Sequence, residues 1–101
     1  MNKASRFRAL LRQAQLIVAP DAYDGITARL IEAGFPTVYM TGAGTAATFG
    51  YPDYGPLTMS EMAENAGRMT AAVSLPVIAG ADTGYPPTYE LAASCRGIES
   101  C

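Results

Sequence analysis

The stretch Val38-Tyr-Met-Thr-Gly-Ala-Gly-Thr-Ala-Ala47 decides the fold, together with Pro76-Val-Ile-Ala-Gly-Ala-Asp-Thr-Gly-Tyr85. Each is a short apolar run that ends in small residues and polar groups. This pattern is typical of a buried parallel strand that carries a binding site at its C-terminal end. An amphipathic segment lies between the two runs. The sequence therefore predicts an α/β enzyme whose chemistry lies on the loops that follow the strands.

Helix and strand patterns alternate along the chain. Three short apolar segments, at 16–19, 37–40 and 75–79, are predicted as adjacent parallel strands in chain order. A loop rich in glycine and proline is expected from 41 to 58. The alternation is typical of a parallel sheet with right-handed crossovers.

Apolar periodicity predicts three helices around these strands. The first covers 3–14, and Asp21 is expected to cap the second, which ends at Gly34. Thr58 and Glu61 have the spacing of a capping box and are expected to start the third helix. The residues expected to face inward are Phe7, Leu10, Leu11 and Ala14 in the first helix, Ile26, Leu30 and Ala33 in the second, and Met62, Ala66, Met69 and Val73 in the third.

Composition limits the class of protein. The chain has 101 residues, which is one domain at most, and it is 50% hydrophobic and 16% charged, as expected for a globular protein. Its net charge of −2 and its lack of a basic run argue against nucleic acid as a partner. No apolar run approaches the roughly 20 residues of a transmembrane helix. We expect no membrane partner and a cytoplasmic location.

The segment Gly42-Ala-Gly-Thr-Ala-Ala47 matches the G-x-G-x-x-A pattern of dinucleotide-binding sites. Such a pattern opens directly into a helix whose N-terminus meets the pyrophosphate. The following residues, Thr48-Phe-Gly-Tyr-Pro-Asp-Tyr-Gly-Pro-Leu57, predict a loop instead. A small nucleotide-binding α/β module therefore remains only an alternative interpretation.

The same small residues can form a cradle for an anion. Successive N–H groups after a strand can bind a carboxylate or stabilise an enolate oxygen, and Thr41 and Tyr39 add two hydroxyl groups. A tight turn that only requires small residues is the structural alternative. Asp82 ends the third apolar run, where a carboxylate needs a partner such as Mg²⁺. Asp53 can approach the same edge or serve as an ordinary turn residue.

These segments together resemble the N-terminal part of the isocitrate lyase/phosphoenolpyruvate mutase superfamily, in particular its methylisocitrate-lyase-like members. The resemblance covers about residues 5–85. The matching segments are Pro20-Asp-Ala-Tyr-Asp24, Ala28-Arg-Leu-Ile-Glu-Ala-Gly-Phe35, Val38-Tyr-Met-Thr-Gly-Ala-Gly44, Gly50-Tyr-Pro-Asp-Tyr-Gly55, Leu57-Thr58 and Leu75-Pro-Val-Ile-Ala79 with Ala81-Asp-Thr-Gly-Tyr85.

The resemblance implies a (β/α)₈ TIM barrel, a Mg²⁺ cofactor and a lyase that cleaves carbon–carbon bonds. The substrates it implies are small α-oxo or α-hydroxy carboxylates that react through an enolate. It also implies site residues. Tyr39, Thr41, Gly42 and Ala43 would line the substrate carboxylate, Asp82 would bind the metal, and Asp53 would lie in the outer shell of the metal.

The chain departs from the superfamily pattern in two places. The superfamily usually has a second aspartate two residues before the one matched by Asp82, and here Gly80 stands there, which implies weakened Mg²⁺ binding. Pro86 follows Tyr85 where the superfamily has glycine, and residues 86–101 diverge from the pattern. We therefore divide the chain into a barrel part, 1–85, and a divergent tail, 86–101.

A complete barrel of this type takes roughly 250 residues. The expected architecture is therefore a truncated barrel with its first helix and first three strands. Such a chain leaves apolar surface uncovered, from which we expect a homo-oligomer. A non-catalytic fragment that acts only by association with a partner chain is the alternative.

Overall fold

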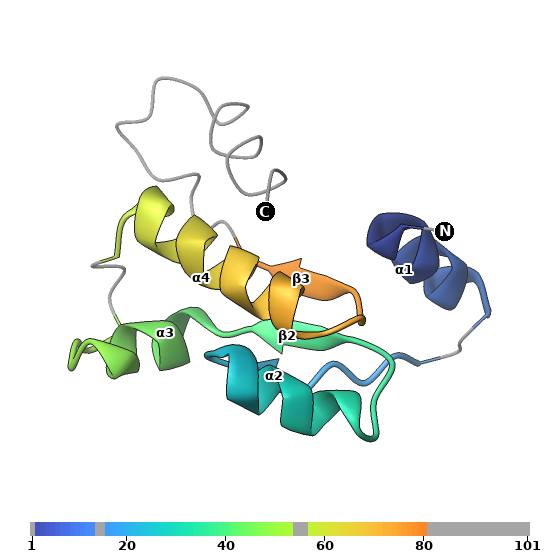
Figure 1. The fold of residues 1–101 in the computed structure, drawn as a ribbon, viewed down its shortest axis with the longest axis horizontal. Coiled ribbons are helices and arrows are strands. Elements are labelled where there is room, and N and C mark those ends of the chain that lie inside the picture. Colours follow the sequence, from blue (N-terminus) through green and yellow to red (C-terminus); the bar gives the residue numbers. More distant parts are fainter. Residues whose placement is uncertain (1, 14–15, 54–56, 81–101) are drawn as a thin grey trace.

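The computed structural model describes residues 2–13, 16–53 and 57–80 (Figure 1). Three strands, β1 (Asp21–Ala22), β2 (Val38–Met40) and β3 (Val77–Ala79), form one parallel sheet in the order β1-β2-β3, as the sequence predicts. The protein therefore has an α/β fold with parallel strands. Its elements in chain order are α1 (Lys3–Gln13), β1 (Asp21–Ala22), α2 (Gly25–Glu32), β2 (Val38–Met40), α3 (Gly42–Thr48), α4 (Met59–Ala72) and β3 (Val77–Ala79).

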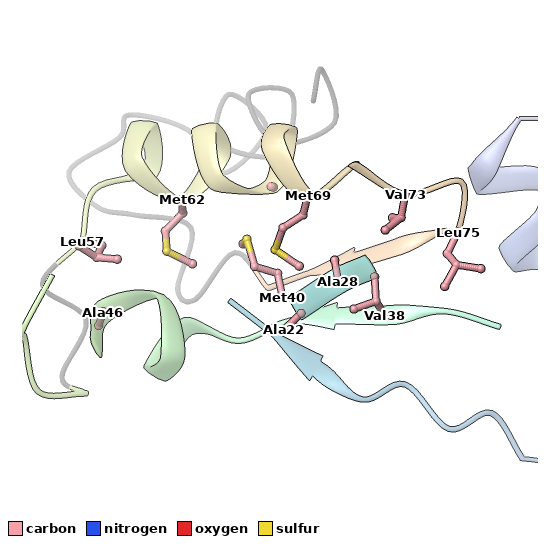
Figure 2. Close-up of a cluster of buried hydrophobic side chains, with 11 residues drawn as sticks. Ala22, Ala28, Val38, Met40, Ala46, Leu57, Met62, Met69, Val73 and Leu75 are labelled. Atoms are coloured by element: carbon pink, nitrogen blue, oxygen red, sulfur yellow. The ribbon is translucent and has the colours of Figure 1, made fainter. Parts of the chain in front are cut away.

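The central strand, β2, divides its side chains between the two faces of the sheet. Val38 and Met40 are buried on one face, beneath α4 (Figure 2). The side chain of Tyr39 alternates to the other face and is half-buried. Helices α2 and α4 contact each other and cover the buried face (Figure 1). The ends of the parallel strands lie at one edge, so the segments that follow them are brought together.

The predicted first strand at 16–19 is wrong. The strand begins at Asp21, and Leu16 is 81% exposed. Pairing with β2 fixes the position, because Tyr39 donates its N–H to the carbonyl of Pro20 and Thr41 donates its N–H to that of Ala22, both at 3.0 Å. An apolar run indicates that a strand is present, but only the hydrogen bonds with the neighbouring strand show where it begins.

The cap of α2 also differs from the prediction. Asp24, rather than Asp21, is the N-cap residue, and its carboxylate accepts a hydrogen bond from the Thr27 N–H at 2.9 Å. The Thr27 hydroxyl in turn accepts the Asp24 N–H at 3.2 Å, which completes a capping box. Asp21 is not free to cap a helix because it belongs to β1.

The predicted inward face of α2 is wrong as well. Ile26, Leu30 and Ala33 are exposed, and Leu30 is 72% exposed. Ala28 is buried instead, and Ile31 packs against the core from the same helix. The helix contacts α4, β1 and β2, and the face that carries Ala28 and Ile31 is the one that joins the core.

The predictions for α4 are confirmed. Thr58 is the N-cap, the Glu61 N–H donates to its hydroxyl at 3.2 Å, and the Glu61 carboxylate accepts the Thr58 N–H at 2.9 Å. The predicted inner face is buried in the core shown in Figure 2. It consists of Met62, Ala66 and Met69, with Val73 at the C-cap.

Helix α1 forms as predicted, with Phe7 and Leu10 half-buried, but Leu11 is exposed and Ala14 lies outside the described residues. Its Lys3 ammonium group donates to the carbonyl of Val73, at the end of α4, at 2.7 Å. Such a contact places a positive charge where a helix leaves carbonyl groups without partners.

The carboxylate of Glu32, the last residue of α2, binds Ser74, which follows the C-cap of α4. It accepts the N–H and the hydroxyl of Ser74, both at 2.7 Å. These hydrogen bonds favour the ionised form and lower the pKa of Glu32 below its ordinary value. In the part of the chain that the structure describes, none of the helices is both long and apolar enough to cross a membrane.

Substitution of Met69 by alanine should destabilise the protein by about 2–5 kcal/mol, because the thioether side chain is fully buried and its loss leaves a cavity. The matched control is Leu30→Ala, which removes an exposed side chain and should change the free energy of unfolding by less than about 0.5 kcal/mol. Urea denaturation measures both. A larger loss from Leu30→Ala than from Met69→Ala would contradict the observed face of α2.

Candidate carboxylate site at the ends of the strands

Thr41 links β2 to α3 and organises the turn between them. Its hydroxyl oxygen accepts the Gly44 N–H at 3.1 Å, which makes Thr41 the N-cap of α3. A Cβ at position 44 would clash with the methyl group of Thr41, so the turn requires glycine there. The small residues of this segment are therefore needed for the fold, whatever else they do.

The predicted loop at 41–58 is wrong over its first half, since α3 occupies Gly42–Thr48. The capping hydroxyl of Thr41 and the run of small residues allow a short helix directly after the strand. The helix ends before Gly50, whose φ of 78° is accessible mainly to glycine. The residues of the G-x-G-x-x-A pattern themselves form this helix, which has only seven residues. No helix follows it in the described residues 49–53, as predicted.

The four predicted carboxylate-binding residues lie on one continuous segment. Tyr39 and Thr41 are half-buried at the end of β2, and Gly42 and Ala43 are exposed at the first two positions of α3. N–H groups at these helix positions have no carbonyl partner within the helix. Hydroxyl and N–H donors are thus present together at the edge where the strands end.

Tyr39 also approaches the end of the neighbouring strand. Its hydroxyl lies 3.1 Å from where a Cβ on Gly80 would be. Strand pairing explains the proximity, because Tyr39 lies opposite Ile78 and the side chains of residues 78 and 80 alternate onto the same face. The Tyr39 hydroxyl therefore occupies the space beside the position where the superfamily has its second aspartate.

The described residues do not by themselves fit a magnesium site. Among residues 2–13, 16–53 and 57–80, no three acidic, histidine or cysteine side chains gather closely enough to hold a metal ion. Gly80 offers no carboxylate, and Asp53 is exposed to solvent. Asp82, the predicted metal ligand, lies outside the described residues, as does the tail at 86–101.

Sequence reasoning missed a buried polar junction behind this segment. Asn65 of α4 donates hydrogen bonds to the carbonyl of Tyr23 at 3.0 Å and to the hydroxyl of Thr45 at 3.2 Å. The Thr45 hydroxyl donates to the carbonyl of Thr41 at 2.6 Å. The sequence did contain a signal for this junction. Asn65 lies three residues after Met62 and four before Met69, so helical spacing places this polar residue on the apolar inner face of α4.

The chain is similar in sequence to a known family and to characterised lyases. The chain matches the family described as phosphoenolpyruvate phosphomutase over residues 7–100. It is 44% identical to 2,3-dimethylmalate lyase from Eubacterium barkeri, over 98% of this chain and 35% of the relative. It is 38% identical to 2-methylisocitrate lyase from Bacillus subtilis, over 92% of this chain and 31% of the relative. The chain thus spans about a third of the length of these relatives.

Solved structures agree with the fold. Phosphoenolpyruvate phosphomutase from Streptomyces platensis subsp. rosaceus superposes with a TM-score of 0.91 at 35% identity, covering 98% of this chain and 35% of that structure. Phosphonopyruvate hydrolase in complex with oxalate and Mg²⁺ superposes with a TM-score of 0.74 at 34% identity, covering 78% of this chain and 28% of that structure. Relatives with bound magnesium therefore exist. The match over residues 7–100 and the shared fold show that the chain belongs to the phosphoenolpyruvate mutase/isocitrate lyase family.

Proposed function

We propose that this chain forms the substrate-carboxylate-binding part of a carbon–carbon lyase that acts on small α-oxo or α-hydroxy carboxylates. The observation that carries the proposal is the continuous segment from Tyr39 to Ala43. It presents two hydroxyl groups and two N–H groups at the edge where the parallel strands end. Membership of a family of lyases and mutases supports the reaction class.

Each donor in this segment has a separate part in binding. The Thr41 oxygen already accepts the Gly44 N–H, so its hydroxyl proton is available to donate to a ligand oxygen. The N–H groups of Gly42 and Ala43 can donate to the same carboxylate, and the Tyr39 hydroxyl lies on the side of β3. Such donors also stabilise the negative charge that develops when a carbon–carbon bond breaks to leave an enolate.

Magnesium would be held by Asp82, with Asp53 in its outer shell, and when bound it would supply a Lewis acid beside the substrate oxygens. Gly80 should weaken this binding because one of the expected carboxylates is missing. The sequence also has no histidine to transfer a proton. We therefore expect carboxylate binding by the 101-residue chain without measurable cleavage.

Oxalate should bind to the chain and shift the NMR amide signals of Thr41, Gly42 and Ala43. Replacement of Thr41 by valine should weaken binding about tenfold, as expected when one hydrogen bond to a charged ligand is lost. The control is Thr58→Val, which removes the cap of α4 and should leave the affinity for oxalate unchanged. Absence of oxalate-dependent shifts at these three amides would contradict the carboxylate site.

The same preparation is assayed for pyruvate release from 2-methylisocitrate and 2,3-dimethylmalate with Mg²⁺. Turnover that disappears in the Asp82→Ala variant would show that the chain has a working metal site, against our expectation.

A Gly80→Asp substitution should strengthen Mg²⁺ binding by adding the carboxylate that the superfamily pattern has two residues before Asp82. The Tyr39 hydroxyl must move by a few tenths of an ångström to admit the new side chain, and it can do so because it is the end of a side chain. Isothermal titration with MgCl₂ measures the effect. Gly80→Asn is the matched control, since it has the same shape without the charge. Equal Mg²⁺ affinities for the two variants would argue against a metal site at this position.

We also propose that the chain forms homo-oligomers. Leu16 and Val18 are exposed beside β1, and in the described part of the chain β3 is paired on one side only. Sedimentation velocity should show oligomers whose population rises with concentration, and Leu16→Glu with Val18→Glu should shift the protein toward the monomer. A monomer at every concentration would contradict the proposal. In that case, association with a different partner chain would be the remaining alternative.

A further inference from the structure

Asn65 is a polar residue in the buried face of α4 and is only 9% exposed. Its amide group donates to the Tyr23 carbonyl at 3.0 Å and to the Thr45 hydroxyl at 3.2 Å. Tyr23 lies in the connection after β1, and Thr45 lies in α3, after β2. One side chain of α4 therefore ties together the segments that follow two neighbouring strands.

The Thr45 hydroxyl has a single proton, and this fixes the direction of its hydrogen bonds. The Thr45 hydroxyl is buried and accepts from Asn65, so its single proton is free for the carbonyl of Thr41, which lies at 2.6 Å. The result is a chain of donors that runs from Asn65 through Thr45 to Thr41. The Thr41 carbonyl also accepts the Thr45 N–H at 3.1 Å.

The end of this chain acts on the peptide unit that carries one of the proposed carboxylate donors, the N–H of Gly42. The carbonyl of Thr41 and the N–H of Gly42 belong to the same peptide unit, which is planar and rigid. A hydrogen bond that holds the carbonyl therefore also holds the direction of the N–H. Donation into the carbonyl polarises the peptide unit and makes its N–H a stronger donor.

We propose that Asn65 and Thr45 are positioning residues for the carboxylate site, acting through the Thr41–Gly42 peptide unit. The inference rests on the proposed function, since the ligand it concerns is the substrate carboxylate. Neither side chain touches the ligand. Both fix the orientation of the Gly42 N–H and so determine how tightly the carboxylate binds.

A purely structural role is the competing interpretation, because any buried hydrogen bond contributes to stability. The chain offers a matched control for it. Thr37 is fully buried, and its hydroxyl donates to the carbonyl of Pro76 at 2.8 Å. This residue precedes β2, at the opposite end of the strand from Thr41. Thr37→Val therefore removes the same kind of bond far from the carboxylate site.

The experiment compares four variants with the unmodified chain: Thr45→Val, Thr45→Ser, Asn65→Asp and Thr37→Val. It measures the dissociation constant for oxalate, the amide proton shift of Gly42 without ligand, and the unfolding midpoint. Thr45→Val should weaken oxalate binding about tenfold and move the Gly42 amide proton upfield. Asn65→Asp, which keeps the shape and loses the donor, should act in the same direction. Thr45→Ser should restore both properties, and Thr37→Val should lower the midpoint without changing either.

Unchanged oxalate affinity and an unchanged Gly42 amide in Thr45→Val would overturn the inference. An equal loss of affinity in Thr37→Val would also overturn it, because the effect would then reflect stability alone. If the unmodified chain does not bind oxalate, the proposed carboxylate site is wrong. The amide proton shift of Gly42 then tests the alignment of the Thr41–Gly42 peptide unit separately. A changed shift in Thr45→Val supports this alignment, and an unchanged shift refutes it.

Discussion

The pairing of β2 with a strand on each side is the interaction on which the rest of the structure depends. Tyr39 donates its N–H to the Pro20 carbonyl, and Val38 donates its N–H to the Pro76 carbonyl at 3.2 Å. Each proline directly precedes an outer strand. Proline has no backbone N–H, but its carbonyl can still accept a hydrogen bond from β2. Pairing on both sides fixes the alternation of β2, so Val38 and Met40 enter the core and Tyr39 faces away from it.

The same pairing sets up the candidate site. Thr41 follows β2 directly and donates its N–H to the Ala22 carbonyl, so its side chain is in place to cap α3. The apolar face of the sheet is covered by helices, whereas the edge where the strands end carries hydroxyl and N–H groups. Asn65 joins these two regions, since it lies in the buried face of α4 and binds the polar edge. Such a buried polar side chain is tolerated because the Tyr23 carbonyl and the Thr45 hydroxyl accept hydrogen bonds from its amide group.

Family membership and local geometry lead to different conclusions about the two parts of the chemistry. The proposed carboxylate-binding residues, Tyr39 and Thr41 to Ala43, lie together at the edge where the strands end. The expected metal-binding residues depart from the superfamily pattern. Gly80 has no carboxylate, and the Tyr39 hydroxyl lies 3.1 Å from where a Cβ at position 80 would be. We therefore propose that binding of the substrate carboxylate and catalysis are separable in this chain, with different residues responsible for each.

The sequence alone determined the features that depend on local patterns. Thr58 and Glu61 are three residues apart and cap each other, and the spacing of Met62 and Met69 identifies the buried face of α4, whatever packs against it. The order of the three strands, the helices α1, α2 and α4, and the family also followed from such patterns, whereas α3 did not. The position of β1 did not, because the N–H groups of β2 select which carbonyl groups they pair with.

Tertiary structure alone decided the buried face of α2 and the role of Asn65. Apolar spacing favoured Leu30 over Ala28, but the contacts of α2 with α4 and the sheet bury Ala28 and leave Leu30 exposed. The partners of Asn65 are 42 and 20 positions away in the chain, and Thr45 reaches Thr41 only because α3 forms. Hydrogen bonds over such separations depend on where the strands bring their following segments together, which no local pattern of residues encodes.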